Sequence, residues 1–399
     1  MKKVLNLLFF TLFSICTLLH AKEQKIRVLL EKNVTDALLE VKGSYYIFDP
    51  FDKAKISSGL FGKRFLIRPT SSGIKWGEEF VDIHQIHIKP KKENSSILVN
   101  GIQYDGDILI YKVGKKVNIV NEVLIEDYVK STLTSEFTYP LEKEVMASVA
   151  IAARTTAYFH INKNKNSFWH VAKGENNYLG SALIIPESFI CSAVDATTNM
   201  ILVNGQKGLN KPFTATWTEH SAGKTAPYHL IFRKDNLAPK YAVEAPHAQV
   251  DRMESRWSYT ISRYHFENIF KIKNLKSIEL FSDQKTAKTY GIRMFDTANE
   301  KKDFSFISVQ NKLGRNNLKS NDMRVELKGS DIIFSGYGKG HSVGICLHSA
   351  SAMAQNGEIA IKILSKFYPE TYLINLTAIP NWEKKITDAP NIKKSAQKL

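Results

Sequence analysis

Ser135-Glu136 is the residue pair best suited to acid–base chemistry, because it stands just before a predicted helix. A carboxylate in such a turn can be partly buried and still face a cleft. Burial raises the pKa of a carboxyl group, and a general acid at a glycosidic oxygen has to be protonated near neutral pH. A glutamate before a helix is also common as a capping or surface residue. Glu136 is therefore a candidate catalytic acid, with a structural role as the alternative.

Arg154 lies on the same predicted helix among small side chains such as Ala150 and Ala157. A guanidinium held between small side chains can present its donors to a carboxylate or to sugar oxygens. An internal ion pair is the alternative, and the sequence leaves both open.

The segment 217–225 places His220 beside Ser221 between predicted strands. Adjacent residues on an extended segment point to opposite faces, so we do not expect a Ser/His hydrolytic pair here.

The glycine-rich segment 336–344 carries Tyr337, Lys339 and His341 between glycines. It follows an apolar strand and precedes a helix, as a phosphate-binding turn does. A dinucleotide fingerprint requires glycine where His341 stands, so this match fails. The alternating glycines predict the close approach of another segment or of a ligand. A metal site is not expected either, because Cys346 and His348 would point about 200° apart on a helix.

Two changes of periodicity predict the elements that hold these residues. Short alternating runs at 65–67, 83–87 and 108–113 indicate a β-rich N-terminal region. Apolar residues at helical spacing predict a long helix from Pro140, in its first turn, to about His160. A second helix is predicted over 347–355, ending before Gly357. The fold class is therefore α+β, with the long helix following the catalytic Glu.

We divide the chain into a signal peptide 1–21, a β-rich region 22–120, a mixed α+β core 121–378 and a basic tail 379–399. Lys2 and Lys3 followed by an apolar run to Leu19 are typical of a signal peptide cleaved after Ala21. The run is shorter than the roughly 20 residues that span a bilayer, so a membrane is a partner only if the segment stays uncleaved. We therefore expect export to a periplasmic or other extracytoplasmic compartment.

The chain is strongly basic, with a formal net charge of +16 over 399 residues. This charge favours a polyanionic partner or an acidic surface. No stretch combines clustered Lys/Arg with spaced aromatics, so we expect no nucleic-acid partner. After export only Cys191 and Cys346 remain, which could pair but do not form a disulfide framework.

Three segments resemble the SpoIID family and occur in that family's order, covering about residues 123–373. The first contains Glu126-Asp127-Tyr128-Val129, Ser135-Glu136 and residues 146–155. The second is His220-Ser221-Ala222-Gly223-Lys224-Thr225. The third is 336–344, followed by Ala350, Met353-Ala354, Gly357, Ile363-Leu364 and Phe367-Tyr368-Pro369. The N-terminal region lies outside the resemblance.

The resemblance implies a lytic transglycosylase that cleaves peptide-stripped peptidoglycan glycan strands, with Glu136 as a single acid/base residue. It implies no cofactor. Some relatives hold a metal near the central loop with a Cys, and this loop has none, so we predict no metal. The residues expected to contact substrate are Ser135, Arg154, His220, Ser221, Tyr337, Lys339 and His341. The positions that depart from the family pattern are Val149, Thr156, Ser342 and Leu347.

The alternative is a non-catalytic wall-binding protein that recruits or enhances a cell-wall amidase, and a weaker alternative is a surface adhesin unrelated to glycan. The first two hypotheses differ at Glu136, which only an enzyme needs. The cellular process stays open between division, wall remodelling and a sporulation-like event.

Overall fold

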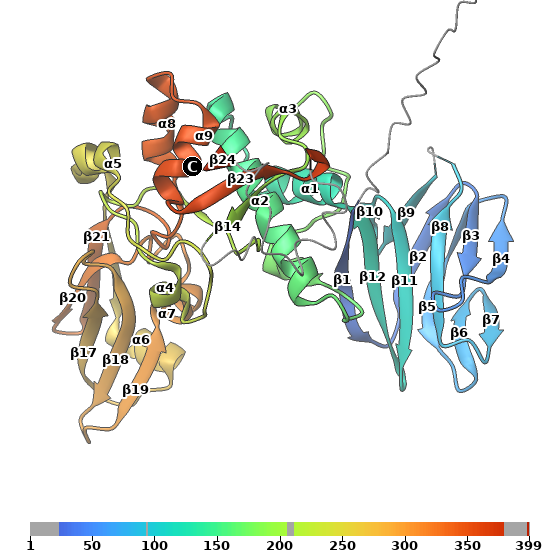
Figure 1. The fold of residues 1–399 in the computed structure, drawn as a ribbon. Helices are drawn as coiled ribbons and strands as arrows, with labels where there is room; N and C mark the ends of the chain where they lie inside the picture. Colours follow the sequence, from blue (N-terminus) through green and yellow to red (C-terminus); the bar gives the residue numbers. More distant parts are fainter. Residues whose placement is uncertain (1–23, 93–94, 206–210, 379–396, 399) are drawn as a thin grey trace, which may run out of the picture.

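The described residues form three parts: paired N-terminal sheets, a group of central helices and a C-terminal lobe (Figure 1). The central part is built from segments that precede and follow the lobe in the sequence. The computed structural model describes residues 24–92, 95–205, 211–378 and 397–398. The predicted signal peptide 1–21 and nearly all of the basic tail 379–399 lie outside the described residues. The α+β fold class is confirmed.

The N-terminal part consists of two antiparallel sheets with alternating burial. Strand β2, for example, buries Ala37, Leu39 and Val41 while its other side chains are partly or fully exposed. The strands are β1 Lys25–Val34, β2 Ala37–Lys42, β3 Tyr45–Phe48, β4 Lys55–Gly59, β5 Lys63–Pro69, β6 Gly73–Trp76, β7 Glu78–Val81, β8 Gln85–Pro90, β9 Ser96–Val99, β10 Ile102–Tyr104, β11 Asp107–Val113 and β12 Lys116–Leu124. One sheet has the order β13-β1-β12-β11-β8-β3-β4 and the other β10-β9-β2-β5-β6-β7. The predicted alternating runs overlap β5, β8 and β11.

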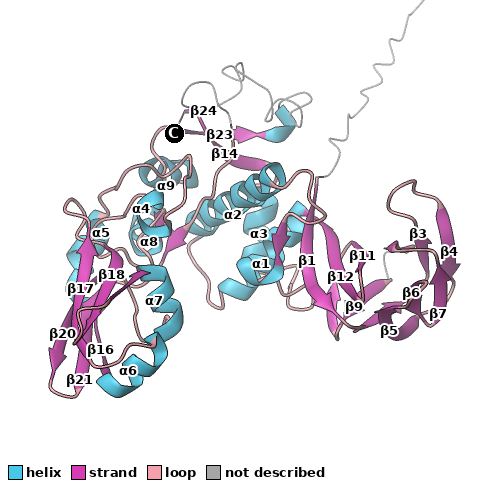
Figure 2. Ribbon diagram, turned by 90° about the horizontal axis from the view of Figure 1, so that it is seen from below, coloured by secondary structure: helices cyan, strands magenta, loops and turns pink. Residues whose placement is uncertain are grey.

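The central part is built around α2, which crosses between the N-terminal sheets and the C-terminal lobe (Figure 2). Its helices are α1 Ile125–Glu136, α2 Lys143–Lys163, α3 Phe189–Ala196, α4 Tyr228–Phe232, α5 Pro246–Val250, α8 Leu347–Gln355 and α9 Ala360–Phe367. Its strands are β13 Val171–Ala172, β14 Met200–Asn204, β15 Trp217–Thr218, β22 Ile345–Cys346, β23 Thr371–Asn375 and β24 Gln397–Lys398, and its 3-10 turns are η1 Lys173–Glu175, η3 Asp251–Ser255 and η4 Leu376–Ala378. Strand β13 pairs in parallel with β1, so a central segment extends the N-terminal sheet.

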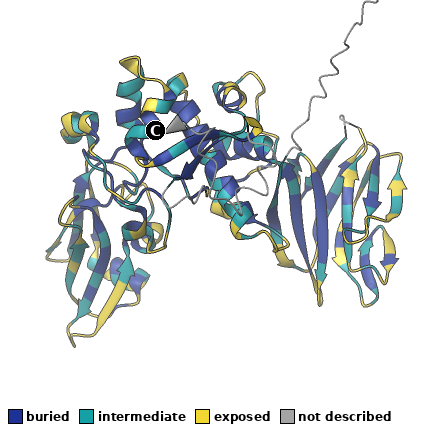
Figure 3. Ribbon diagram, in the orientation of Figure 1, coloured by how far each residue is buried: buried dark blue, intermediate teal, exposed yellow. Residues whose placement is uncertain are grey.

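The C-terminal lobe has its own hydrophobic cluster, which includes Phe266, Phe306 and Phe334. It contains β16 Arg256–Ser262, α6 Arg263–Phe270, β17 Leu275–Ser282, β18 Thr289–Asp296, β19 Lys301–Ser305, α7 Phe306–Leu313, β20 Asp322–Lys328 and β21 Asp331–Tyr337. The hydroxyls of Ser262 and Ser305 accept backbone N–H groups and cap α6 and α7. By contrast, the N-terminal sheets and the central helices share one large buried cluster, whose buried strands and helices are dark blue in Figure 3.

The structure confirms the two predicted helices and contains others that were not predicted, among them α1. The long helix α2 begins at Lys143, so Pro140 lies in the turn before it and not in its first turn. Helix α8 has the predicted bounds, and Gly357 follows it with a φ of +84°. Helix α1 was not predicted, and Glu136 is its last residue instead of a turn residue. No helix among the described residues is long and apolar enough to span a membrane.

Candidate functional site

Glu136 ends α1 with its side chain exposed to solvent. The amide Nδ2 of Asn177 donates to its Oε2 at 3.1 Å. Ser135 in turn donates its hydroxyl to the backbone oxygen of Asn177 at 2.6 Å, which holds that segment against α1. The sequence predicted a partly buried carboxylate, and this is corrected: α1 carries Glu136 out to the surface, where one amide orients it.

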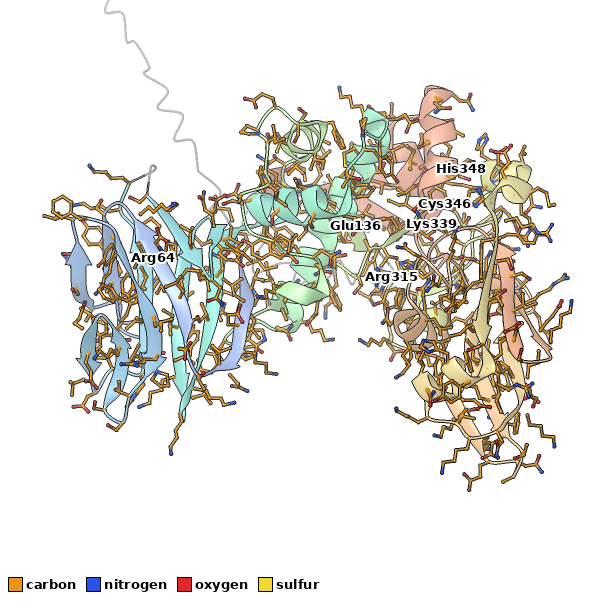
Figure 4. The ribbon with its side chains drawn as sticks, turned by 180° about the vertical axis from the view of Figure 1, so that it is seen from behind. Arg64, Glu136, Arg315, Lys339, Cys346 and His348 are labelled. Carbon is orange, nitrogen blue, oxygen red and sulfur yellow. The ribbon has the colours of Figure 1, made fainter. Side chains whose placement is uncertain are left out.

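The phenol of Tyr139 lies within electrostatic reach of three charged side chains, those of Glu136, Glu219 and Lys339. The ammonium of Lys339 pairs with Oε2 of Glu219 at 2.7 Å, and both side chains are about half exposed. The pKa of Tyr139 is raised, first by burial of its phenol and then by the carboxylates of Glu219 and Glu136, while Lys339 acts in the opposite direction. One phenol therefore senses all three charges, and Figure 4 shows Glu136 and Lys339 close together in projection. We call these four residues the Glu136 site.

The glycine-rich segment packs against the central loop. A Cβ at Gly338, Gly340 or Gly344 would lie 2.4 Å from the oxygen of His220, 2.2 Å from Oγ1 of Thr218 or 2.0 Å from the oxygen of Thr216. The backbones of His220 and Lys339 exchange two hydrogen bonds of 2.9 Å. The alternating glycines predicted the close approach of either another segment or a ligand. The first is confirmed, because the central loop occupies the space beside these glycines.

His220 and Ser221 lie beneath this contact instead of lining an open groove. His220 is buried, and its Nδ1 accepts the N–H of Ala222 at 3.1 Å. Burial, followed by the neighbouring ring of His348, lowers the pKa of His220 to about 4, so the imidazole is neutral near pH 7. Ser221 is fully buried. The expectation that Ser221 contacts substrate is corrected, because its hydroxyl is closed off from solvent.

Arg154 forms an internal ion pair. Its side chain is fully buried, and its Nε and Nη2 donate to both carboxylate oxygens of Glu126 at 2.7–3.0 Å. The remaining donors reach the backbone oxygens of Val194 at 3.0 Å and Met200 at 3.2 Å. All hydrogen-bond donors of Arg154 are used inside the protein. The prediction that Arg154 contacts substrate is therefore wrong, and the alternative prediction of an internal ion pair is confirmed. The pair instead ties α1, α2 and α3 together.

The rings of Tyr337 and His341 contact other side chains of the C-terminal half, Arg252 and Phe232 respectively. The guanidinium of Arg252 stacks on Tyr337, 4.3 Å from its centroid. Nδ1 of His341 accepts the N–H of Val343 at 3.1 Å, and burial, followed by Arg315, lowers the pKa of His341 to about 4. Of the predicted site residues, the described contacts bring only Ser135, Glu136 and Lys339 to the Glu136 site.

The described residues contain one cluster that could hold a metal ion: His87, Asp107 and Glu122 on the N-terminal sheet. The ammonium of Lys25 lies 3.1 Å from Asp107 and 3.7 Å from Glu122. A lysine already supplies the positive charge there, so the residues do not fit a metal.

The cysteine and histidine of the glycine-rich end have separate partners. The sulfur of Cys346 accepts the N–H of Ser221 at 3.3 Å, whereas His348 bonds to Asp251 at 2.8 Å. Cys346 and His348 are labelled in Figure 4. Cys191 and Cys346 are buried free thiols.

Sequence reasoning missed Tyr139, Asn177 and Glu219. Asn177 is 41 residues from Glu136, and its contact depends on how the segment after η1 folds back along α1. Tyr139 lies only three residues after Glu136, next to Pro140, and an aromatic beside a candidate acid is a signal that could have identified it.

Comparisons with known proteins match the part of the chain that carries Glu136. Residues 113–204 match the family model SpoIID, "Stage II sporulation protein". An uncharacterized protein of Chlamydia muridarum is 36% identical over 184 residues, which cover 46% of this chain and 64% of that protein. One of Chlamydia pneumoniae is 33% identical over 189 residues, 47% of this chain and 68% of that protein. One of Brachyspira hyodysenteriae is 26% identical over 362 residues, which cover 87% of this chain and 92% of that protein. The match spans less than two thirds of the first of these relatives.

Proposed function

The chain belongs to the SpoIID family, and on that premise we propose that it is exported and cleaves peptidoglycan glycan strands as a lytic transglycosylase. Family membership supports a role at the cell wall. The single observation that carries the enzymatic proposal is the exposed carboxyl of Glu136, which Asn177 orients and which acts on the phenol of Tyr139 together with the pair formed by Lys339 and Glu219.

In the proposed reaction Glu136 acts first as an acid and then as a base. Protonated Glu136 donates its proton to the glycosidic oxygen as the bond from that oxygen to C1 of the muramic acid breaks. The primary hydroxyl of the same sugar then bonds to C1 and returns its proton to the Glu136 carboxylate. The ring closure needs no water, so a second carboxylate that activates water is not required. Because Glu136 is exposed in the free protein, the bound strand has to exclude water from it.

Lys339 is the proposed contact for the lactyl carboxylate of a peptide-free muramic acid. Its ammonium is half exposed and is held by Glu219. A substrate carboxylate would replace or share that partner in a charge-assisted hydrogen bond. A contact between Lys339 and a free lactyl carboxylate favours strands without stem peptides, because the amide bond to a stem peptide removes the negative charge of the lactyl group.

A second candidate function is a wall-binding protein that recruits or enhances an amidase. The exposure of Glu136 favours it, because the protein alone does not surround this carboxyl with apolar groups. The two functions share the strand as ligand and differ in whether Glu136 is needed.

The test is to incubate peptide-free glycan strands with the chain from Lys22 onward and to separate the soluble fragments by mass. Wild-type protein and Glu358→Gln, which changes an exposed glutamate after α8, should release anhydro-ended fragments. Glu136→Gln should bind strands and leave them intact. Cleavage by Glu136→Gln at the wild-type rate would refute the enzymatic proposal, and strands that bind every variant but stay intact would favour the binding protein.

A further inference from the structure

A second cavity lies at the C-terminal end of α2 and has no part in the reaction described above. Its volume is about 650 Å³, within the range of small-molecule sites. The last turn of α2 lines it with Phe159, His160 and Lys163, and the opposite wall includes Trp169 and Lys234.

Two chain segments connect this cavity to the Glu136 site. The first is the end of η1: Glu175 lines the cavity, and Asn177, two residues later, binds the Glu136 carboxylate. The second is the stretch 214–219: Thr214 lines the cavity, and Glu219 pairs with Lys339. Five extended residues cover about 17 Å, so both connections are short. The separation suits a few consecutive sugars of one strand.

The second segment also follows α2 from the cavity towards the Glu136 site. Oγ1 of Thr156 on α2 donates to the oxygen of Ala215 at 2.8 Å and accepts its N–H at 2.9 Å. The ring of Trp217, two residues further, lies 6.0 Å from the ring of Phe137, next to Glu136. The segment 214–219 is therefore held in place near the cavity and near the Glu136 site.

The lining suits an uncharged ligand rich in hydroxyl and amide groups. Its lysines, Lys163 and Lys234, are matched by the carboxylates of Glu175 and Asp235. The pKa of His160 is lowered, first by burial and further by both lysines, with Glu175 opposing, so its ring is neutral near pH 7.

The aromatic rings complete the recognition surface. Phe159, Trp169 and Tyr228 line the cavity, and Lys163 lies 5.7 Å from the Phe159 centroid. Aromatic faces pack on the C–H faces of sugars by dispersion, while the surrounding donors and acceptors bond their hydroxyls. A polyanion would find no excess of positive charge here.

We propose that this cavity is a distal subsite that binds an N-acetylated sugar of the same glycan strand, away from the bond that Glu136 acts on. The ligand class rests on the proposed function. The subsite would make affinity depend on strand length, because a short fragment at the Glu136 site does not reach the cavity.

The test is titration calorimetry in the Glu136→Gln background, which keeps the strands intact. The probes are peptide-free glycan oligosaccharides of one disaccharide repeat and of several repeats. Two variants alter the cavity, Phe159→Ala and Lys234→Ala, and the second changes an exposed side chain. Lys165→Ala, also exposed and outside the cavity, is the matched control.

Phe159→Ala should weaken binding of the long probes about tenfold, the size of one lost aromatic contact, and Lys234→Ala should also weaken it. Both variants should leave binding of the one-repeat probe unchanged. Lys165→Ala should bind both probes as the parent does. Equal long-probe affinity in parent and both cavity variants would overturn the subsite while leaving the proposed cleavage intact. Failure of the parent to bind any glycan probe would overturn both. If the cavity variants lost affinity for the long probes only, and the wild-type protein did not cleave strands, the subsite would stand and only the proposed enzymatic activity would be refuted.

Discussion

Glu126 and Glu136 stand on the same helix, and their surroundings give them opposite roles. Glu126, in the first turn of α1, is bound on both oxygens by the buried Arg154. Glu136, in the last turn, accepts one amide and is otherwise exposed. A carboxylate whose two oxygens both accept hydrogen bonds from a buried guanidinium has no oxygen left to contact a ligand. Only Glu136 is therefore free to act on a ligand.

Replacing Arg154 should destabilise the protein without any direct effect on substrate. Arg154→Met leaves the partly buried Glu126 unpaired and removes bonds to two backbone oxygens, so the free energy of unfolding should fall by about 3 kcal/mol. Arg64→Met is the control, because Arg64 is exposed and lies 3.5 Å from Glu40, and it should change stability by less than about 1 kcal/mol (Figure 4). Denaturant titration measures both. Equal small losses would contradict the internal role.

The central loop and the glycine-rich segment form the element that presents Lys339. Strands β15 and β22 pair in parallel, and the glycines bring the two segments into backbone contact. A side chain at any of these glycines would separate the segments and move Lys339 from Glu219. The glycines therefore position the site by allowing close approach and not by binding phosphate.

Gly340→Ala should destabilise this element strongly. Gly340 has a φ of +106°, and a new Cβ would clash with Oγ1 of Thr218. The expected loss is about 3 kcal/mol in the free energy of unfolding. Gly357→Ala is the matched control, since its φ is +84° but its surroundings are open, and it should lose only about 1 kcal/mol. Thermal unfolding distinguishes the two, and equal losses would show that the contact with Thr218 does not matter.

The junction of β1 with the central part should weaken in acid. His170 is buried, and its Nδ1 accepts the N–H of Arg27 at 3.0 Å. Burial, followed by Arg27, lowers the pKa of His170 from 6.5 to about 4. The unfolded chain therefore binds the proton first, so this stability is fully present above pH 6.5 and is lost as pH falls towards 4, by up to about 3 kcal/mol.

Denaturant titrations from pH 7 to about 4 test this. Wild-type protein should lose stability over the window, and His170→Gln should lose less, because the glutamine does not titrate. His229→Gln, at an exposed position, should keep the wild-type slope. If the free energy of unfolding of His170→Gln fell with pH as steeply as that of the wild type, the acid sensitivity would not come from His170.

The sequence predicts elements with a clear local period better than contacts between elements. Helices α2 and α8 follow from apolar spacing and a terminal glycine. Arg154 carried two readings because its partner, 28 residues away on an unpredicted helix, is not visible in the local pattern. Asn177 and Glu219 reach Glu136 and Lys339 only after distant segments fold together, so residue type and spacing could not place them.

At the scale of the whole molecule, the two largest buried clusters mark two units. One cluster joins the N-terminal sheets to the central helices, and a separate one fills the C-terminal lobe (Figure 3). The Glu136 site draws its carboxyl from the first unit and Lys339 from the segment that follows the last strand of the second. Loosening of the lobe should therefore disturb the site without unfolding α1 or α2.

Matched substitutions test this division. Ile119 and Ile332 are both fully buried, one in each cluster. Each change to alanine should cost about 2–5 kcal/mol. Hydrogen exchange should show Ile332→Ala accelerating exchange in 256–337 alone, and Ile119→Ala in the sheets and central helices together. Uniform acceleration across the whole chain by both variants would contradict two units.

The most direct measurement of the central claim is the mass of the fragments released from peptide-free strands in heavy-oxygen water. The account predicts anhydro-ended fragments with no heavy oxygen at the new ends, made by wild-type protein and Glu358→Gln but not by Glu136→Gln. Ring closure by the sugar's own hydroxyl brings in no solvent oxygen. One heavy oxygen at C1 of each new reducing end would mean hydrolysis and would contradict the single-residue mechanism. Intact strands with wild-type protein would contradict the enzyme itself.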